Sequence, residues 1–163
     1  MFSRPITWAN FRRDPFGTFM CALIHLTTRG RYNHAAIQLD DSRMIEATNR
    51  GVVISPIASL DEIRTFLPFC AGDLDCAGRY DGNDLEEVLA WAAGRVGWKY
   101  GYLNAAICGL RSMWPGLQIK VANTAICSEL VAESLERAGH YFGKDSALVS
   151  PGDLAEHFGV PRT

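Results

Sequence analysis

The grouping of short β-rich runs between helical regions is the feature that most constrains the fold. Residues 32–39, 43–47 and 51–55 are rich in β-branched and apolar residues and follow one another without a helical segment between them. Residues 65–69 form a fourth such run, although Pro68 places it at a sheet edge or a strand end. Strands that are grouped in this way favour an α+β fold, with a small antiparallel sheet or partial barrel packed against helices, over an alternating α/β fold.

Helical periodicity is found on both sides of these runs. Residues 14–27 have an Asp-Pro start and an apolar stripe, and a second helical pattern begins at Asn83. Residues 98–102 are predicted to form an aromatic loop, and residues 103–110 a short helix. A last short helix is expected to open at residues 150–154.

The length and charge of the chain limit the class of protein. With 163 residues we expect a single domain, residues 1–163. The formal charge of −2 provides no electrostatic footprint for nucleic acid, so no nucleic-acid partner is expected. The longest apolar stretch, residues 16–26, is shorter than the roughly 20 residues that a membrane span needs. The oligomeric state stays open.

The cysteines argue against both a metal site and a disulfide framework. There are five, an odd number, and they lack the CxxC spacing of a zinc site. We therefore expect a reducing compartment and no metal or other cofactor. The N-terminus lacks the pattern of a Sec signal, which favours a soluble, cytoplasmic protein by default, with delivery by another route left open.

A cysteine lies in the first turn of a predicted helix over residues 123–139. Asn123 or Thr124 is expected to cap the start of this helix, and Gly139 to end it. At a helix start, free backbone N–H groups and the helix dipole favour the thiolate, so Cys127 is a candidate nucleophile. The alternative is that Cys127 is a small buried hydrophobe on a core helix. The face expected to pack against the core consists of Cys127, Leu130, Val131, Ser134, Leu135 and Ala138.

A cysteine nucleophile needs a base, and one of the four histidines lies in a suitable context. His25, His140 and His157 have no evident orienting partner in the sequence. His34 lies in the first β-rich run, and the alternation of that strand puts Gln38 on the same face as His34.

The turn after this strand decides which carboxylate can reach His34. If residues 40–42 form a three-residue loop, Ala36 pairs with Glu46, and Glu46 then lies diagonally beside His34. A two-residue loop would move Glu46 to the opposite face of the sheet. Glu46 and Gln38 are therefore alternative partners that could orient the imidazole.

These motifs together resemble a known family. Residues 32–37 look like the histidine strand, residues 44–47 with 51–52 like the second strand, and residues 126–131 like the nucleophile helix of the circularly permuted branch of NlpC-type, papain-like cysteine hydrolases. Residues 150–154 resemble a segment near the end of that family. Its relatives include lecithin:retinol acyltransferase-like enzymes. The resemblance implies a permuted papain-like fold, with the histidine before the cysteine in the chain.

The resemblance also implies an activity. Cys127 would attack a carbonyl to form an acyl-enzyme, with His34 as its base and Glu46 orienting His34. The backbone N–H of Cys127 would bind the oxyanion. A second donor is expected, for which Tyr100 or Tyr102 is a candidate; the alternative is that both tyrosines are packing or rim residues. Cell-wall peptides cleaved by a peptidase or amidase are the first expectation. A lipid acyltransferase or thioesterase with the same three residues, and a catalytically silent binding module, are the alternatives.

Overall fold

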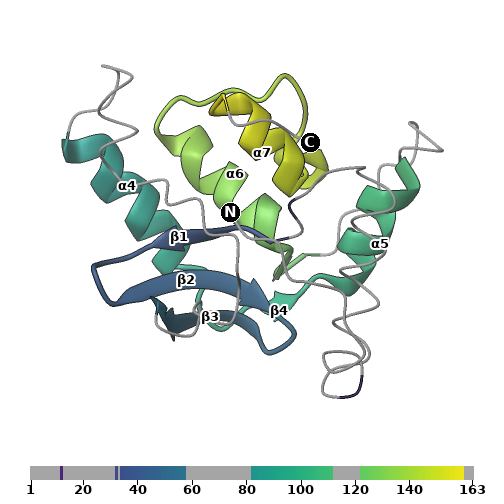
Figure 1. The fold of residues 1–163 in the computed structure, drawn as a ribbon, viewed down its shortest axis with the longest axis horizontal. Coiled ribbons are helices and arrows are strands. Elements are labelled where there is room, and N and C mark those ends of the chain that lie inside the picture. Colours follow the sequence, from purple (N-terminus) through teal and green to yellow (C-terminus); the bar gives the residue numbers. More distant parts are fainter. Residues whose placement is uncertain (1–11, 13–31, 33, 58–81, 112–121, 160–163) are drawn as a thin grey trace.

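Three consecutive strands form a small antiparallel sheet. The computed structural model describes residues 12, 32, 34–57, 82–111 and 122–159. In this part of the chain, β1 (Ala36–Gln38), β2 (Arg43–Thr48) and β3 (Gly51–Pro56) pair in the order β1-β2-β3. Helices lie beside this sheet (Figure 1), so the expected α+β class with a small antiparallel sheet is confirmed.

The turn between β1 and β2 has the three-residue form. The backbone N–H of Leu39 donates to the carbonyl of Arg43 at 2.9 Å, which closes the loop over residues 40–42. Asp40 stabilises the loop because its carboxylate accepts hydrogen bonds from the Ser42 backbone N–H at 2.9 Å and from Arg43 Nε at 2.7 Å. The register that pairs Ala36 with Glu46 is therefore as predicted. The first strand is shorter than predicted, because His34 forms only an isolated bridge before β1 begins.

The helices expected after the sheet are present. The described helices are α4 (Gly82–Ala93), α5 (Tyr102–Arg111), α6 (Cys127–Arg137), the short 3₁₀ helix η2 (Ser146–Leu148) and α7 (Pro151–His157). None of them is long and apolar enough to cross a bilayer. The helix predicted over residues 14–27 and the strand predicted over residues 65–69 lie outside the described residues.

The aromatic segment after α4 corrects one prediction. Residues 98–102 are not a plain loop, because β4 (Lys99–Tyr100) pairs in parallel with β5 (Thr124–Ala125). The prediction failed because each strand has only two residues and the partner lies far along the chain. Two hydrogen bonds of 2.9 Å, from the Val52 N–H to the Trp98 carbonyl and from the Gly97 N–H to the Val52 carbonyl, join this segment to β3.

Gly51 is required where β3 approaches this segment. Its φ of +102° is in the left-handed region, and a Cβ atom at this position would lie 2.3 Å from the carbonyl oxygen of Trp98. Only glycine can adopt this backbone conformation and leave room for the neighbouring chain.

Helix α6 packs between two apolar clusters. The sheet-side cluster contains Cys127 and Leu130, and the α7-side cluster contains Val131 and Leu135. The other buried members of the sheet-side cluster are Ile45, Ala47, Val52, Ala92 and Ala125, and those of the α7-side cluster are Tyr32, Ala35, Ala132, Val149, Leu154 and Ala155. The predicted core face is confirmed except at Ala138, which is only partly buried. The helix is more deeply buried than the predicted face alone, since Ser128, Glu129 and Ala132 are also buried.

The start of α6 differs from the prediction, whereas its end agrees. Ile126, with φ −96° and ψ 161°, is the N-cap residue, while Thr124 belongs to β5 and Asn123 has a φ of +55° in the preceding turn. The capping prediction was wrong because β5 uses the residues just before the helix. Gly139, with a φ of +78°, follows the C-cap Ala138 and ends the helix.

Candidate active site

The three residues singled out in the sequence lie together where the sheet meets the start of α6. Glu46 is in the middle of β2, His34 forms its bridge just before β1, and Cys127 is the first residue of α6. The hairpin brings His34 and Glu46 together locally. The packing of α6 against β1 and β2 then adds Cys127, which is more than 80 positions away in the chain.

His34 and Glu46 form a direct contact. Nε2 of His34 lies 2.8 Å from Oε2 of Glu46, and the two side chains are only 19% and 12% exposed. Burial would raise the pKa of Glu46, but the hydrogen bond and charge of His34 outweigh it and the pKa is lowered. The hydroxyl of Ser55 and the charge of Arg50 act in the same direction. Glu46 is therefore an ionised partner for the imidazole.

The pKa of His34 is raised well above its usual value. Burial acts to lower it, but hydrogen bonds and charge attraction from Cys127 and Glu46 prevail and raise the pKa to about 9. Because Nε2 contacts Glu46, the other ring nitrogen, Nδ1, is left for Cys127. His34 is consequently protonated at neutral pH.

The thiol of Cys127 is shifted in the opposite direction. It is buried, at 3% exposure, and burial by itself would raise its pKa. The hydrogen bond and charge of His34 are stronger, and the backbone N–H groups of Ala35 and Ser128 also donate to the sulfur, so the pKa is lowered. The site can therefore hold a thiolate beside an imidazolium.

Gln38, the alternative orienting residue, is turned away from this site. It is exposed, and its Nε2 donates a hydrogen bond to the carbonyl of Asp40 at 3.2 Å. In this structure Glu46, not Gln38, contacts the imidazole.

Two further groups at the site escaped the sequence analysis. The backbone N–H of Ala35, just before β1, donates to the Cys127 sulfur, and no sequence pattern predicts a main-chain donor from so distant a segment. Glu129 is only 1% exposed, and its Oε2 accepts the backbone N–H of Ile126 at 3.3 Å. A Glu three residues after the N-cap is the usual signal for this contact, but it was hidden because the cap was placed at the wrong residue.

The tyrosines named as a second oxyanion donor have other contacts. Tyr102 donates its hydroxyl to the carbonyl of Asn49 at 3.3 Å, and its ring centroid lies 4.8 Å from that of Tyr100. Tyr100 also packs against Ala105 and Ile126. An oxyanion role for either tyrosine stays a prediction.

Two of the histidines that had no evident partner in the sequence, His140 and His157, contact each other. His140 Nδ1 and His157 Nε2 lie 2.9 Å apart, where the segment after α6 meets the end of α7. Phe142 and Phe158 pack against both rings. These two histidines form a pair separate from the Cys127 site, while His25 lies outside the described residues.

Comparisons of the chain with protein-family models, with curated proteins and with solved structures found no match. The papain-like fold and its permutation therefore stay predictions. The function is inferred from the geometry of Cys127, His34 and Glu46.

Proposed function

We propose that this protein is a cysteine hydrolase that cleaves amide bonds through Cys127, His34 and Glu46. The observation that supports the proposal is the chain of contacts from Glu46 to His34 at 2.8 Å, and from His34 to a buried cysteine whose pKa is lowered. A structural cysteine packed in a core has no need of a charged histidine beside it. A nucleophile next to a base, with the base held by a third group, is the arrangement that acyl-transfer chemistry requires.

In the first step, the Cys127 thiolate attacks the carbonyl carbon of the substrate. A C–S bond forms, the carbonyl π electrons move to oxygen, and the resulting oxyanion accepts a hydrogen bond from the backbone N–H of Cys127. As the C–N bond breaks, His34 donates its proton to the leaving amine. The products of this step are a thioester on Cys127, a free amine and a neutral imidazole.

In the second step, water releases the acyl group. Neutral His34 takes a proton from water while the water oxygen attacks the thioester carbon. The C–S bond then breaks, the acid leaves, and the thiolate and the imidazolium are restored. Glu46 keeps the imidazole oriented and stabilises its positive charge in both steps.

For the substrate class, we propose peptide amides of the bacterial cell-wall type. The support for this choice is the resemblance of residues 32–37, 44–47 with 51–52, and 126–131 to permuted NlpC-type hydrolases. Incubation with muropeptides should release cleaved peptides, and mass spectrometry after rapid acid quench should find an acyl group on Cys127.

Substitution of the nucleophile tests the proposal directly. Cys127→Ala should abolish both turnover and the acyl adduct, since alanine has no atom that can attack. Cys108→Ala, a cysteine replacement within α5, is the matched control and should retain activity. Undiminished turnover in Cys127→Ala would refute the proposal.

The same assay separates the alternatives. An acyl adduct that forms from acyl lipids and not from muropeptides would assign the site to a lipid acyltransferase or thioesterase. A wild-type Cys127 that reacts with neither substrate, and that is labelled by iodoacetamide only above the pH of an ordinary thiol, would identify a silent binding module.

A further inference from the structure

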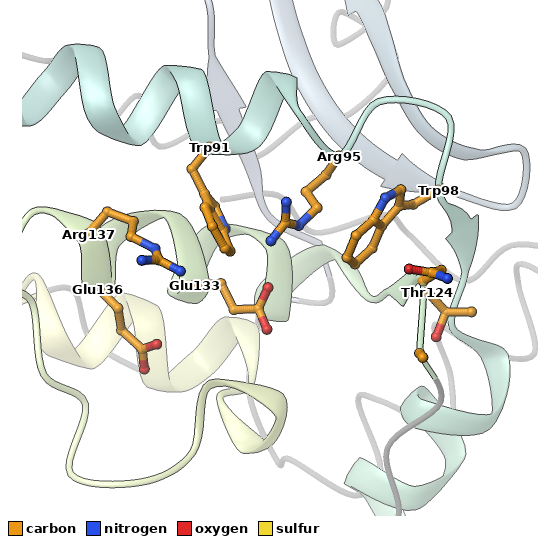
Figure 2. Close-up of a pocket in the computed structure, with 9 residues that line it drawn as sticks. Trp91, Arg95, Trp98, Thr124, Glu133, Glu136 and Arg137 are labelled. Carbon is orange, nitrogen blue, oxygen red and sulfur yellow. The ribbon is translucent and has the colours of Figure 1, made fainter.

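A groove of about 750 Å³ lies between α4 and α6, away from the three proposed catalytic residues. Its volume is within the range of small-molecule sites, and neither Cys127, His34 nor Glu46 lines it. The lining residues with large side chains are Trp91, Arg95, Trp98, Glu133, Glu136 and Arg137 (Figure 2).

Two arginines and two tryptophans alternate along this groove. The guanidinium carbon of Arg95 lies 3.6 Å from the ring centroid of Trp91 and 4.4 Å from that of Trp98. The guanidinium carbon of Arg137 lies 3.7 Å from the Trp91 centroid. Figure 2 shows Trp91 between the two guanidiniums and Trp98 beyond Arg95. The indole rings cover the faces of the guanidiniums, so that only their edges are available for hydrogen bonds.

The guanidiniums of this stack have no ion-pair partner among the described residues. Among the described residues, neither Arg95 nor Arg137 forms an ion pair, although Glu133 and Glu136 line the same groove. In addition, Arg95 Nε and Trp91 Nε1 are buried and have no acceptor within the described residues. A stack that served only to join α4 to α6 would be expected to satisfy its own donors.

We propose that the groove between α4 and α6 binds the carboxylate of a small ligand with a flat or apolar body. The planar fork of a guanidinium matches a carboxylate in a bidentate hydrogen bond, and two guanidiniums fixed by indole rings are preorganised for it. The indole faces provide an apolar surface for the rest of the ligand. A carboxylate is preferred to a phosphate because two glutamates line the groove beside the two arginines, so that a ligand with a single negative charge adds less charge to this lining.

This ligand site does not depend on the chemistry proposed for Cys127. It is formed by residues of α4, α6 and the segments around β4 and β5, and it would remain if Cys127 were inert. Binding is therefore measured directly and needs no turnover.

The experiment titrates the full chain with N-benzoylglycine, which has a carboxylate and an aromatic ring. Binding is followed through the indole N–H resonances of Trp91 and Trp98 in ¹H–¹⁵N spectra, assigned with Trp→Phe variants. N-benzoylglycinamide and phenyl phosphate are titrated in parallel. We expect saturable shifts of both resonances with the carboxylate, and binding at least about tenfold weaker for the amide, which lacks the charge.

Variants test which residues bind. Arg95→Gln and, separately, Arg137→Gln should each raise the Kd for N-benzoylglycine about tenfold. Arg137 is exposed and stacks on a single indole, so Arg137→Gln serves as the test if Arg95→Gln fails to fold. Arg43→Gln, which removes an exposed arginine paired with Asp40 outside the groove, is the matched control and should leave the Kd unchanged.

Four results would each overturn the proposal. They are the absence of saturable shifts, equal affinity for the amide, tighter binding of phenyl phosphate than of the carboxylate, and an unchanged Kd in the folded arginine variants. A loss of stability in Arg95→Gln without ligand binding by the wild-type chain would show that the stack is purely structural.

Discussion

At the scale of single residues, burial and hydrogen bonding act in opposite directions on Cys127 and His34. Burial favours the neutral thiol and the neutral imidazole, because a charge loses its hydration in the interior. Each group is nevertheless shifted toward its charged form, because the thiolate and the imidazolium attract each other. The negative charge of Glu46 also stabilises the imidazolium. The ionised pair therefore exists only while all three side chains keep their positions.

These pKa shifts predict the pH range in which Cys127 reacts. Cys127, with its lowered pKa, is a thiolate at pH values where a free thiol of pKa about 8.5 is protonated, and His34 stays protonated up to about pH 9. Iodoacetamide should label Cys127 at pH values below about 8.5, and turnover should fall as pH rises through about 9 because the leaving amine then lacks its acid. The rate of Cys127 labelling as a function of pH, followed by peptide mapping with mass spectrometry, tests the first of these two predictions.

His34→Ala is the control for this profile. Without the imidazolium, burial raises the pKa of the Cys127 thiol, so labelling should shift to higher pH. Wild-type labelling that rises only above about pH 8.5 would contradict the ion pair.

The two alternative orienting residues are distinguished by substitution. Glu46→Gln removes the charge that helps to raise the pKa of His34 above its usual value, so an NMR titration of the His34 ring should show a lower pKa than in the wild type. The loss of a charge-assisted hydrogen bond should reduce kcat/KM by roughly 10- to 100-fold. Gln38→Ala removes only an exposed contact with Asp40 and should change neither quantity. The opposite pattern would assign the role to Gln38.

At the scale of secondary-structure elements, the well-predicted elements begin or end at side-chain hydrogen bonds between neighbouring residues. The loop over residues 40–42 closes on the Asp40 carboxylate, and α7 opens on a capping box between Ser150 and Asp153. Oδ2 of Asp153 accepts hydrogen bonds from Ser150 N at 2.8 Å and Ser150 Oγ at 2.7 Å, and also contacts Lys144. Such contacts between near neighbours in the chain are determined locally.

The cap of α7 predicts a measurable loss of stability. Ser150→Ala removes the hydroxyl that accepts the Asp153 N–H, and the free energy of unfolding should fall by about 1 kcal/mol. Urea unfolding at neutral pH measures this change. No change in the midpoint would show that α7 does not need its cap.

The pH dependence of the unfolding free energy tests the role of Asp153, the partner of Ser150 in this cap. Burial would raise the pKa of Asp153, but hydrogen bonds from Lys144 and Ser150 lower it. A lowered carboxyl pKa contributes stability above the unfolded value of about 3.9, and this contribution is lost as pH falls through the folded pKa. Asp153→Asn should therefore destabilise the protein at pH 7. It should also weaken the fall of the unfolding free energy with decreasing pH in the acid range. Asp41→Asn, in an exposed turn, is the control.

At the scale of the whole molecule, α6 connects the two apolar clusters. Leu130 is fully buried in the sheet-side cluster, which also contains Cys127 and Ile45. Leu130→Ala should lower the free energy of unfolding by about 2–5 kcal/mol, a large part of the 5–15 kcal/mol typical of a domain. Leu103→Ala, in α5 with 55% exposure, is the matched control and should change it by less than about 0.5 kcal/mol. Equal effects in urea unfolding would contradict the central position of α6.

Much of the fold and of the candidate site was predictable where neighbouring residues determine the structure. The register of Ala36 with Glu46, the helix beginning near Cys127 and the start of α7 at Ser150 all depend on contacts within a few residues or across one tight turn. The pairing of β4 with β5 and the correct cap of α6 were missed, because both depend on packing between distant segments.

The sequence by itself determined that His34 and Glu46 share a face of the hairpin if residues 40–42 form a three-residue loop, and the structure decided that the loop has this form. It also placed Cys127 in the first turn of a helix, through apolar periodicity. Only the tertiary structure decided that Cys127 meets His34, that Ala35 donates to its sulfur, and that Arg95 lies between two indoles. These contacts join residues far apart in the chain, and their positions follow from how α6 packs against the sheet and α4.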